Sequence, residues 1–140
     1  MRYYDDIIIH CTNTREGRDV HVDEIRGWHR QYGWEDCGYH YIVTLDGSVE
    51  VGRPLEREGQ HCKGHNRDSV AVAYVGGLNR YGLPADTRTP AQRKAIATIV
   101  WNLTVRALNA GFGLPSVHGH RDYTPNKDCP CFDAAFEYGG

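Results

Sequence analysis

The hydrophobic pattern along the chain predicts two central strands. Three consecutive isoleucines within Asp6–His10 form a β-branched run, which is typical of a strand buried on both faces. Val70–Val75 alternates larger and smaller residues that are apolar on both faces, and Gly76-Gly77 ends this segment. We therefore expect both segments to lie inside a sheet rather than at its edge.

Two further segments change to helical periodicity. Val22–Tyr32 has apolar residues and a histidine at helical spacing, and a glycine follows it. The second helix has stronger start signals, because Thr89 can act as the N-cap, Pro90 occupies the first helical position and Gln92 completes a capping box. Apolar residues then recur every three or four positions until Gly111, which predicts one buried face.

A hairpin and a short C-terminal region complete the predicted elements. Tyr39–Thr44 and Ser48–Arg53 flank the dipeptide Asp46-Gly47, which is a strong hairpin signal between apolar alternations. A short apolar piece surrounds Val117, a loop follows it, and a last turn is expected at Phe132–Phe136.

These elements predict an α/β fold with a central mixed β-sheet flanked by helices. The chain has 140 residues, which is the size of one domain, and it contains no repeat or linker. We therefore expect residues 1–140 to form a single domain.

Composition and charge exclude several classes of protein. The net charge is −2, from 16 basic and 18 acidic residues, so the chain lacks the basic excess that drives nucleic-acid binding. No apolar run approaches the ~20 residues that cross a bilayer, and the N-terminus resembles no signal peptide. The five cysteines are an odd number, so we expect thiols that are free or bound to metal in a reduced compartment.

Three residues are placed where they could bind a metal ion. His10 ends the first buried strand, His120 lies in the segment VHGHRDYTPNKDCP, and Cys129 follows nine residues later. Zinc accepts imidazole nitrogen and thiolate sulfur, and a catalytic zinc has three protein ligands and one open position. Spacing alone does not exclude His118 and Cys131 as the ligands, nor a His10 that simply hydrogen-bonds a neighbouring carbonyl.

Five motifs in matching order resemble those of a known family. They are IIIHCTNT, GWEDCGYHYIVTLDGSVEVGR, HCKGHNRDSVAVAYVGG, the TPAQ before the long helix, and HGHRDYTPNKDCPCFD. This order is similar to that of the zinc-dependent N-acetylmuramoyl-L-alanine amidases of type 2, a family that includes amidase-type lysozymes of bacteriophages and the peptidoglycan recognition proteins. The resemblance covers roughly residues 5–136.

The resemblance implies a set of metal ligands. His10, His120 and Cys129 match the ligand positions of the family, which leaves His118 and Cys131 outside the ligand set. The non-catalytic recognition proteins typically lack the cysteine, so the cysteine here implies an active enzyme.

The resemblance also implies three residues around the metal. Tyr39 matches a tyrosine beside the metal that could relay a proton, Lys127 matches a lysine of the phage members that could stabilise an oxyanion, and His61 matches a cleft histidine with a supporting role. Without the resemblance, Tyr39 would be interpreted as a core aromatic and Lys127 as a solvated loop residue. We expect Trp28, Trp34 and Trp101 to cover the core or sheet rather than to bind sugar, although Trp34 lies in a loop near the expected cleft.

The activity that the resemblance implies is hydrolysis of the bond between N-acetylmuramic acid and L-alanine in peptidoglycan. We expect a Zn²⁺-dependent endolysin that is a monomer, is made in the host cytoplasm, and acts on the wall after release. The alternatives are an antibacterial effector amidase, a peptidoglycan-binding module of the same fold without activity, and a metal-free enzyme with Cys129 as nucleophile. Metal content and sensitivity to a chelator distinguish these classes.

Overall fold

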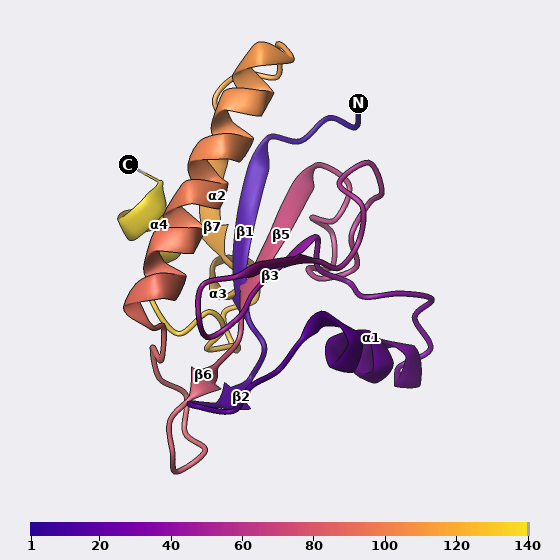
Figure 1. Cartoon of the computed structure of the whole chain (residues 1–140). Coiled ribbons are helices and arrows are strands. Elements are labelled where there is room, and N and C mark those ends of the chain that lie inside the picture. The colour runs from indigo at the N-terminus through magenta and orange to yellow at the C-terminus, as the bar shows by residue number, and fades with distance from the viewer. Residues whose placement is uncertain (140) are drawn as a thin grey trace.

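A five-stranded mixed sheet forms the centre of the computed structural model, which describes residues 1–139 (Figure 1). Its strand order is β4-β3-β5-β1-β7, with β3, β1 and β7 each parallel to a neighbour and β4 antiparallel to β3. The strands of this sheet are β1 (Asp6–Cys11), β3 (Tyr41–Val43), β4 (Val49–Val51), β5 (Ser69–Tyr74) and β7 (Ser116–Gly119). The predicted mixed sheet flanked by helices is therefore confirmed.

Strands β1 and β5 are the most deeply buried part of the sheet. Every residue of both strands is buried, as expected for apolar runs that have a layer on each face. They pair in parallel from Asp6 opposite Ser69 to Cys11 opposite Tyr74. Both predicted central strands are thus confirmed.

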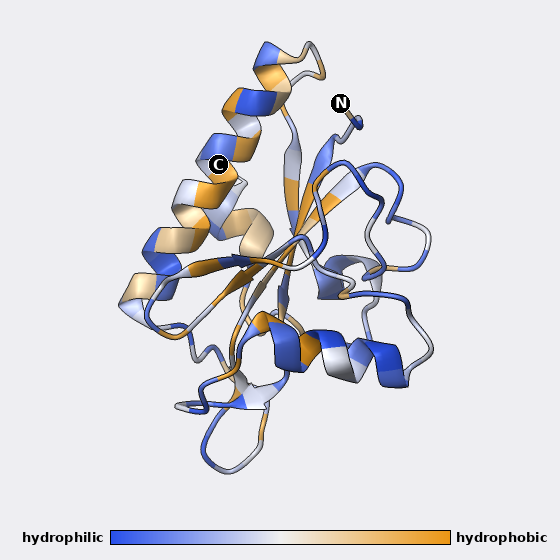
Figure 2. Ribbon diagram, turned by 45° about the vertical axis from the view of Figure 1, so that its right-hand side comes forward, coloured by the Kyte–Doolittle hydropathy of each residue, from blue (hydrophilic) through white to orange (hydrophobic). Residues whose placement is uncertain are grey.

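The two faces of the sheet have different covers, which follows from the two-residue period of a strand. On one face, Ile7 and Ile9 pack in a cluster with the buried side of α2 (Pro90–Asn109). On the other face, Ala73 packs with Ile25 of α1 (Val22–Gln31). Figure 2 shows the hydrophobic residues along the central strands and hydrophilic residues over the loops.

The start of α2 has the predicted capping box. The Thr89 hydroxyl accepts from the Gln92 N–H at 3.1 Å, and the Gln92 side chain accepts from the Thr89 N–H at 2.9 Å. Gln92 is fully buried, and its amide also donates to the Val75 carbonyl at 2.9 Å, so the cap joins the helix to the end of the sheet.

Within residues 1–139, no helix is long and apolar enough to cross a membrane.

Several short elements differ from the prediction. Strands β2 (Thr14–Arg15) and β6 (Gly77–Leu78) form a separate parallel pair, and α3 (His120–Tyr123) replaces part of the predicted loop. Elements of two to four residues have no periodicity that a sequence could show. The last helix, α4 (Ala134–Tyr138), overlaps the predicted turn at Phe132–Phe136 and begins two residues after the start of that turn.

One aromatic expectation is wrong. Trp101 lies on the outer side of α2 with 68% of its surface exposed, so it covers neither the core nor the sheet. Trp101 lies outside the spacing of three and four positions that the buried apolar residues of α2 follow, so the periodicity of the helix is consistent with its exposure.

The N-terminus of α1 is held by a residue of the hairpin. A Glu50 carboxylate oxygen accepts from the Val22 N–H at 2.8 Å, and the other oxygen lies 2.8 Å from Nδ1 of His21. Asp19 lies 3.1 Å from Nε2 of the same ring. Glu50 first, and then Asp19, raise the pKa of His21 to about 8, because both carboxylates favour the protonated ring.

We predict that Glu50→Gln lowers the pKa of His21 towards its ordinary value of about 6.5, as measured by NMR titration of the ring protons. The raised pKa stabilises the fold fully below pH 6.5, and this contribution is lost as the pH rises through about 8. The wild type should therefore exceed the variant in Tm more at pH 6 than at pH 9. Glu58→Gln, at an exposed position, is the control, and an unchanged His21 pKa in Glu50→Gln would contradict the assignment.

Candidate metal centre

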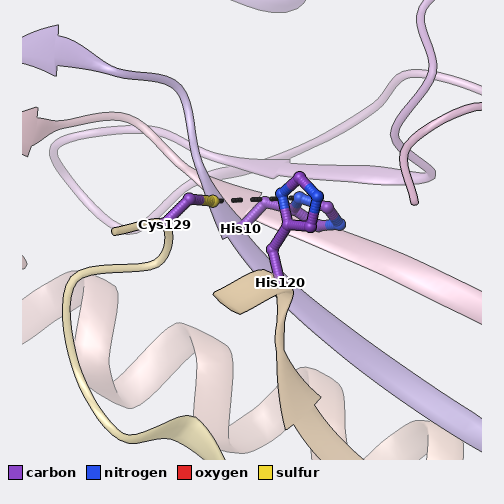
Figure 3. Close-up of side chains that lie close together, drawn as sticks. All are labelled: His10, His120 and Cys129. Carbon is purple, nitrogen blue, oxygen red and sulfur yellow. Dashed lines mark hydrogen bonds between the residues drawn. The ribbon is translucent and has the colours of Figure 1, made fainter. Parts of the chain in front are cut away.

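Three side chains far apart in the sequence converge at the carboxyl edge of the sheet. One ligand atom from each of His10, His120 and Cys129 lies within 4.8 Å of the others, and the sequence predicted this set. Figure 3 shows the two rings and the sulfur facing one another, with Cys129 Sγ 3.9 Å from His10 Nδ1. The ring centroids of the two histidines are 4.6 Å apart.

Strand pairing explains why the two histidines meet. His10 lies near the end of β1, and His120 directly follows β7. Because Ile9 pairs with Gly119 in parallel register, the next residues, His10 and His120, lie at the same level along the strands. His10 is also opposite Ala73 of β5, so its side chain lies on the face that α1 covers.

Backbone hydrogen bonds position the sulfur of Cys129. The Cys11 N–H donates to Cys129 Sγ at 3.1 Å, so the residue after His10 also contacts the third candidate ligand. The Arg121 N–H donates to the Cys129 carbonyl at 2.8 Å, which joins the cysteine loop to α3. An N–H donor at this distance stabilises a thiolate, the form that binds metal.

Burial keeps the two histidines neutral. His10 is 1% exposed, and burial, followed by the neighbouring His61 and His120, holds its pKa well below 6.5. Burial also lowers the pKa of His120, with a further contribution from Lys127. A neutral imidazole has the free lone pair that a metal requires, so both rings are in the binding form near neutral pH.

His61 contacts the ring of His10 on the side away from the sulfur. His61 Nδ1 lies 2.8 Å from His10 Nε2, and His61 Nε2 lies 3.0 Å from the Ser69 hydroxyl. Burial, followed by the nearby His40, lowers the pKa of His61 to about 3, so the ring is neutral. If His10 Nδ1, which faces the sulfur, is the nitrogen that binds a metal, the proton lies on Nε2 and is donated to His61 Nδ1, which would fix the tautomer and orientation of His10.

Tyr39 and Lys127 line the cavity beside the three candidate ligands. The ring centroid of Tyr39 lies 5.1 Å from that of His10, and burial raises the pKa of its phenol well above 10. Tyr39 therefore keeps its proton at physiological pH. Lys127 is an exposed residue of the loop between α3 and Cys129.

The two alternatives that spacing left open lie outside the cluster of ligand atoms. His118 points to Asp6, with Nδ1 2.9 Å from a carboxylate oxygen. Cys131 donates to the Gly77 carbonyl at 3.3 Å. Neither side chain reaches the other candidate ligands in residues 1–139.

The sequence predicted that Arg121 and Asp122 brace this loop, but not the contact that joins α3 to β1. The Tyr123 hydroxyl donates to Asp6 of β1, which links the short helix to the strand that carries His10. The Asp122 carboxylate accepts from the Gly119 N–H at 2.8 Å, next to His120. The charge of Asp6 within an apolar strand was the one available signal, because a buried carboxylate needs donors.

A cavity of about 260 Å³ opens over the cluster, and aromatic side chains from α1 and the following loop form one wall. These side chains are Trp28, Tyr32 and Trp34, so two of the tryptophans line the site. A larger cavity of about 600 Å³ lies between α2 and the β3–β4 hairpin. It contains none of the predicted site residues, so the chemistry belongs to the smaller cavity.

Residues 2–132 match the family model described as N-acetylmuramoyl-L-alanine amidase. The chain is 42% identical over 127 residues to an endolysin of Klebsiella phage KP32, covering 91% of this chain and 80% of that protein. An endolysin of Escherichia phage T7 is 38% identical over 129 residues, covering 92% and 82%.

Solved structures share the fold. The endolysin amidase LysCS of Clostridium intestinale URNW is 25% identical with a TM-score of 0.75, covering 97% of this chain and 80% of that chain. PGRP-SA of the bumblebee is 25% identical with a TM-score of 0.74, covering 97% and 83%.

Proposed function

The chain belongs to the N-acetylmuramoyl-L-alanine amidase family, and from this membership we propose that it cleaves peptidoglycan with a zinc ion held by His10, His120 and Cys129. The bond that it hydrolyses joins N-acetylmuramic acid to L-alanine. The observation on which the proposal depends is the convergence of two neutral imidazoles and one sulfur within 4.8 Å at the floor of a cavity.

The donor set fits zinc in chemistry and in number. Two histidines and one cysteine supply nitrogen and sulfur ligands, and a three-ligand set is typical of catalytic rather than structural zinc. The Cys11 N–H at 3.1 Å and the His61 contact at 2.8 Å are the outer hydrogen bonds that such ligands require. When bound, zinc supplies a Lewis acid that polarises the scissile carbonyl and lowers the pKa of water towards ~7.

The surrounding residues have separate roles in this proposal. Lys127 places a cation at the edge of the cavity, where it can stabilise the negative charge that develops on the scissile carbonyl oxygen. Tyr39 keeps its proton and can donate it as a hydrogen bond to that oxygen or to the leaving amine. His61 does not contact the substrate in this scheme, because its two ring nitrogens are engaged by His10 and Ser69.

Similarity to phage endolysins supports a role in host lysis. We propose that the chain is made in the host cytoplasm, acts as a monomer, and reaches the wall after release. A binding module without activity would not need the complete ligand set. A metal-free Cys129 nucleophile needs one imidazole as its base, whereas two histidines converge on this sulfur, and inactivation by a chelator distinguishes the two mechanisms.

We predict that His10→Ala, His120→Ala and Cys129→Ala each abolish zinc retention and wall hydrolysis, because two remaining ligands do not hold the ion. Mass spectrometry of the metal and of peptides released from purified wall measures both outcomes. His118→Ala and Cys131→Ala are matched controls two residues away from ligands, and they should keep one zinc per chain. Full activity of Cys129→Ala after treatment with a chelator would exclude the mechanism.

Lys127→Ala should lower kcat by about 10²–10³-fold while zinc content stays unchanged, because a preorganised charge next to a developing oxyanion has this magnitude. Steady-state rates on soluble peptidoglycan strands measure the effect. Lys94→Ala, which lines the cavity beside α2, should leave kcat unchanged. A loss of zinc in Lys127→Ala would instead assign the lysine to the metal site.

His61→Ala should weaken zinc affinity by about 10–100-fold, because His10 loses the acceptor that orients its ring. Competition with a chromophoric chelator measures this affinity without any turnover. His61→Asn should restore part of the affinity, since its carbonyl oxygen can accept from His10. His65→Ala, in the same loop but stacked on Tyr123, is the control, and equal zinc affinity in His61→Ala and His65→Ala would contradict the orienting role.

A further inference from the structure

Asn13 has a backbone conformation that residues other than glycine rarely adopt. Its φ is 55°, in the left-handed region, and it lies between the end of β1 and the start of β2. The segment is held on both sides, because the Thr12 N–H donates to the Tyr74 carbonyl and the Thr14 N–H to the Gly76 carbonyl, each at 3.0 Å. Glycine would adopt this conformation without steric cost, whereas a residue with a side chain bears ~1 kcal/mol of backbone strain. The presence of asparagine here therefore indicates that its side chain has a function.

Asn13 lies where two cavities meet. The cavity with the aromatic wall and a second cavity of about 360 Å³ both contain Asn13, Lys127 and Cys129. Leu78 of β6 and Pro84 of the loop that follows it line the second cavity. Cys129 and Lys127 are thus shared by two cavities whose other walls come from different parts of the chain, α1 and its following loop in one and β6 and its following loop in the other.

The substrate of the proposed function has a matching shape. A glycan strand and a peptide leave the scissile amide in different directions, so an enzyme that cuts this amide needs two hollows that meet at its reactive groups. The residue at the junction can contact the atoms directly next to the scissile bond. On the sugar side these atoms are a methyl group and an ether oxygen, whereas on the peptide side they include an amide carbonyl, which is the stronger acceptor.

We propose that Asn13 determines peptide recognition by donating a hydrogen bond from Nδ2 to the carbonyl oxygen of the first amino-acid residue of the peptide. The inference rests on the proposed function and adds the contact next to the cleaved bond. The Cys11 thiol donates to Asn13 Oδ1 at 3.5 Å, which orients the carboxamide. Asn13 Nδ2 donates no hydrogen bond within residues 1–139, so its two N–H groups are available to a ligand.

Two substitutions separate the donor from the backbone. Asn13→Gly keeps the left-handed conformation and removes the side chain, whereas Asn13→Asp keeps its size and shape but lacks the N–H donors. Both should raise KM on sonicated, soluble peptidoglycan strands by about tenfold, or ~1.4 kcal/mol of binding. The value of kcat should change less than about twofold, because a hydrogen bond outside the reacting amide binds the ground state and the transition state alike.

The controls distinguish recognition from structure. Asn109→Gly, at the exposed end of α2, should leave KM unchanged. Asn13→Gly should keep the zinc content of the wild type, and its Tm should not fall below that of the wild type. An unchanged KM in Asn13→Gly, an effect confined to Asn13→Asp, or a KM increase that accompanies loss of zinc or of Tm would each overturn the inference. If the wild type itself releases no peptide that begins with L-alanine, the proposed function fails as well.

Discussion

The parallel pairing of β1 with β7 is the constraint on which the site depends. Parallel strands end at the same edge of a sheet, and the register that places Ile9 opposite Gly119 brings His10 and His120 to one level. The two residues are 110 positions apart in the chain, so no local interaction could hold them together. A shift of this register by one residue would turn one of the rings to the opposite face.

The site also depends on which side chains of β1 lie on each face of the sheet. One face of β1 is apolar and packs under α2, which stabilises the fold. The other face has Asp6 and His10, which lie beneath α1 and the loop that contains His61. Buried polar groups destabilise a fold unless they are hydrogen-bonded. Here Asp6 contacts Tyr123 and His10 contacts His61, so the hydrogen bonds that offset burial also hold the candidate ligand His10 in place.

The predictable parts of the structure are those that a local sequence pattern specifies. The buried isoleucine run, the hairpin dipeptide and the capping box of α2 each reflect a local preference that the fold keeps. The ligand set required the family resemblance, because spacing alone treated His118 and His120 alike. The three-dimensional contacts give the physical difference between them, since His118 pairs with Asp6 while His120 faces Cys129.

The small β2–β6 pair, which no pattern predicted, explains how strain beside the site persists. It fixes the chain after β1, so Asn13 remains left-handed at the junction of the two cavities. The same pair needs Gly77, because a Cβ there would lie 2.4 Å from the sulfur of Cys11. Cys11 in turn donates its N–H to Cys129 and its thiol to Asn13. One buried cysteine therefore contacts both a candidate metal ligand and the residue we assign to peptide recognition, which couples the position of the substrate to that of the metal.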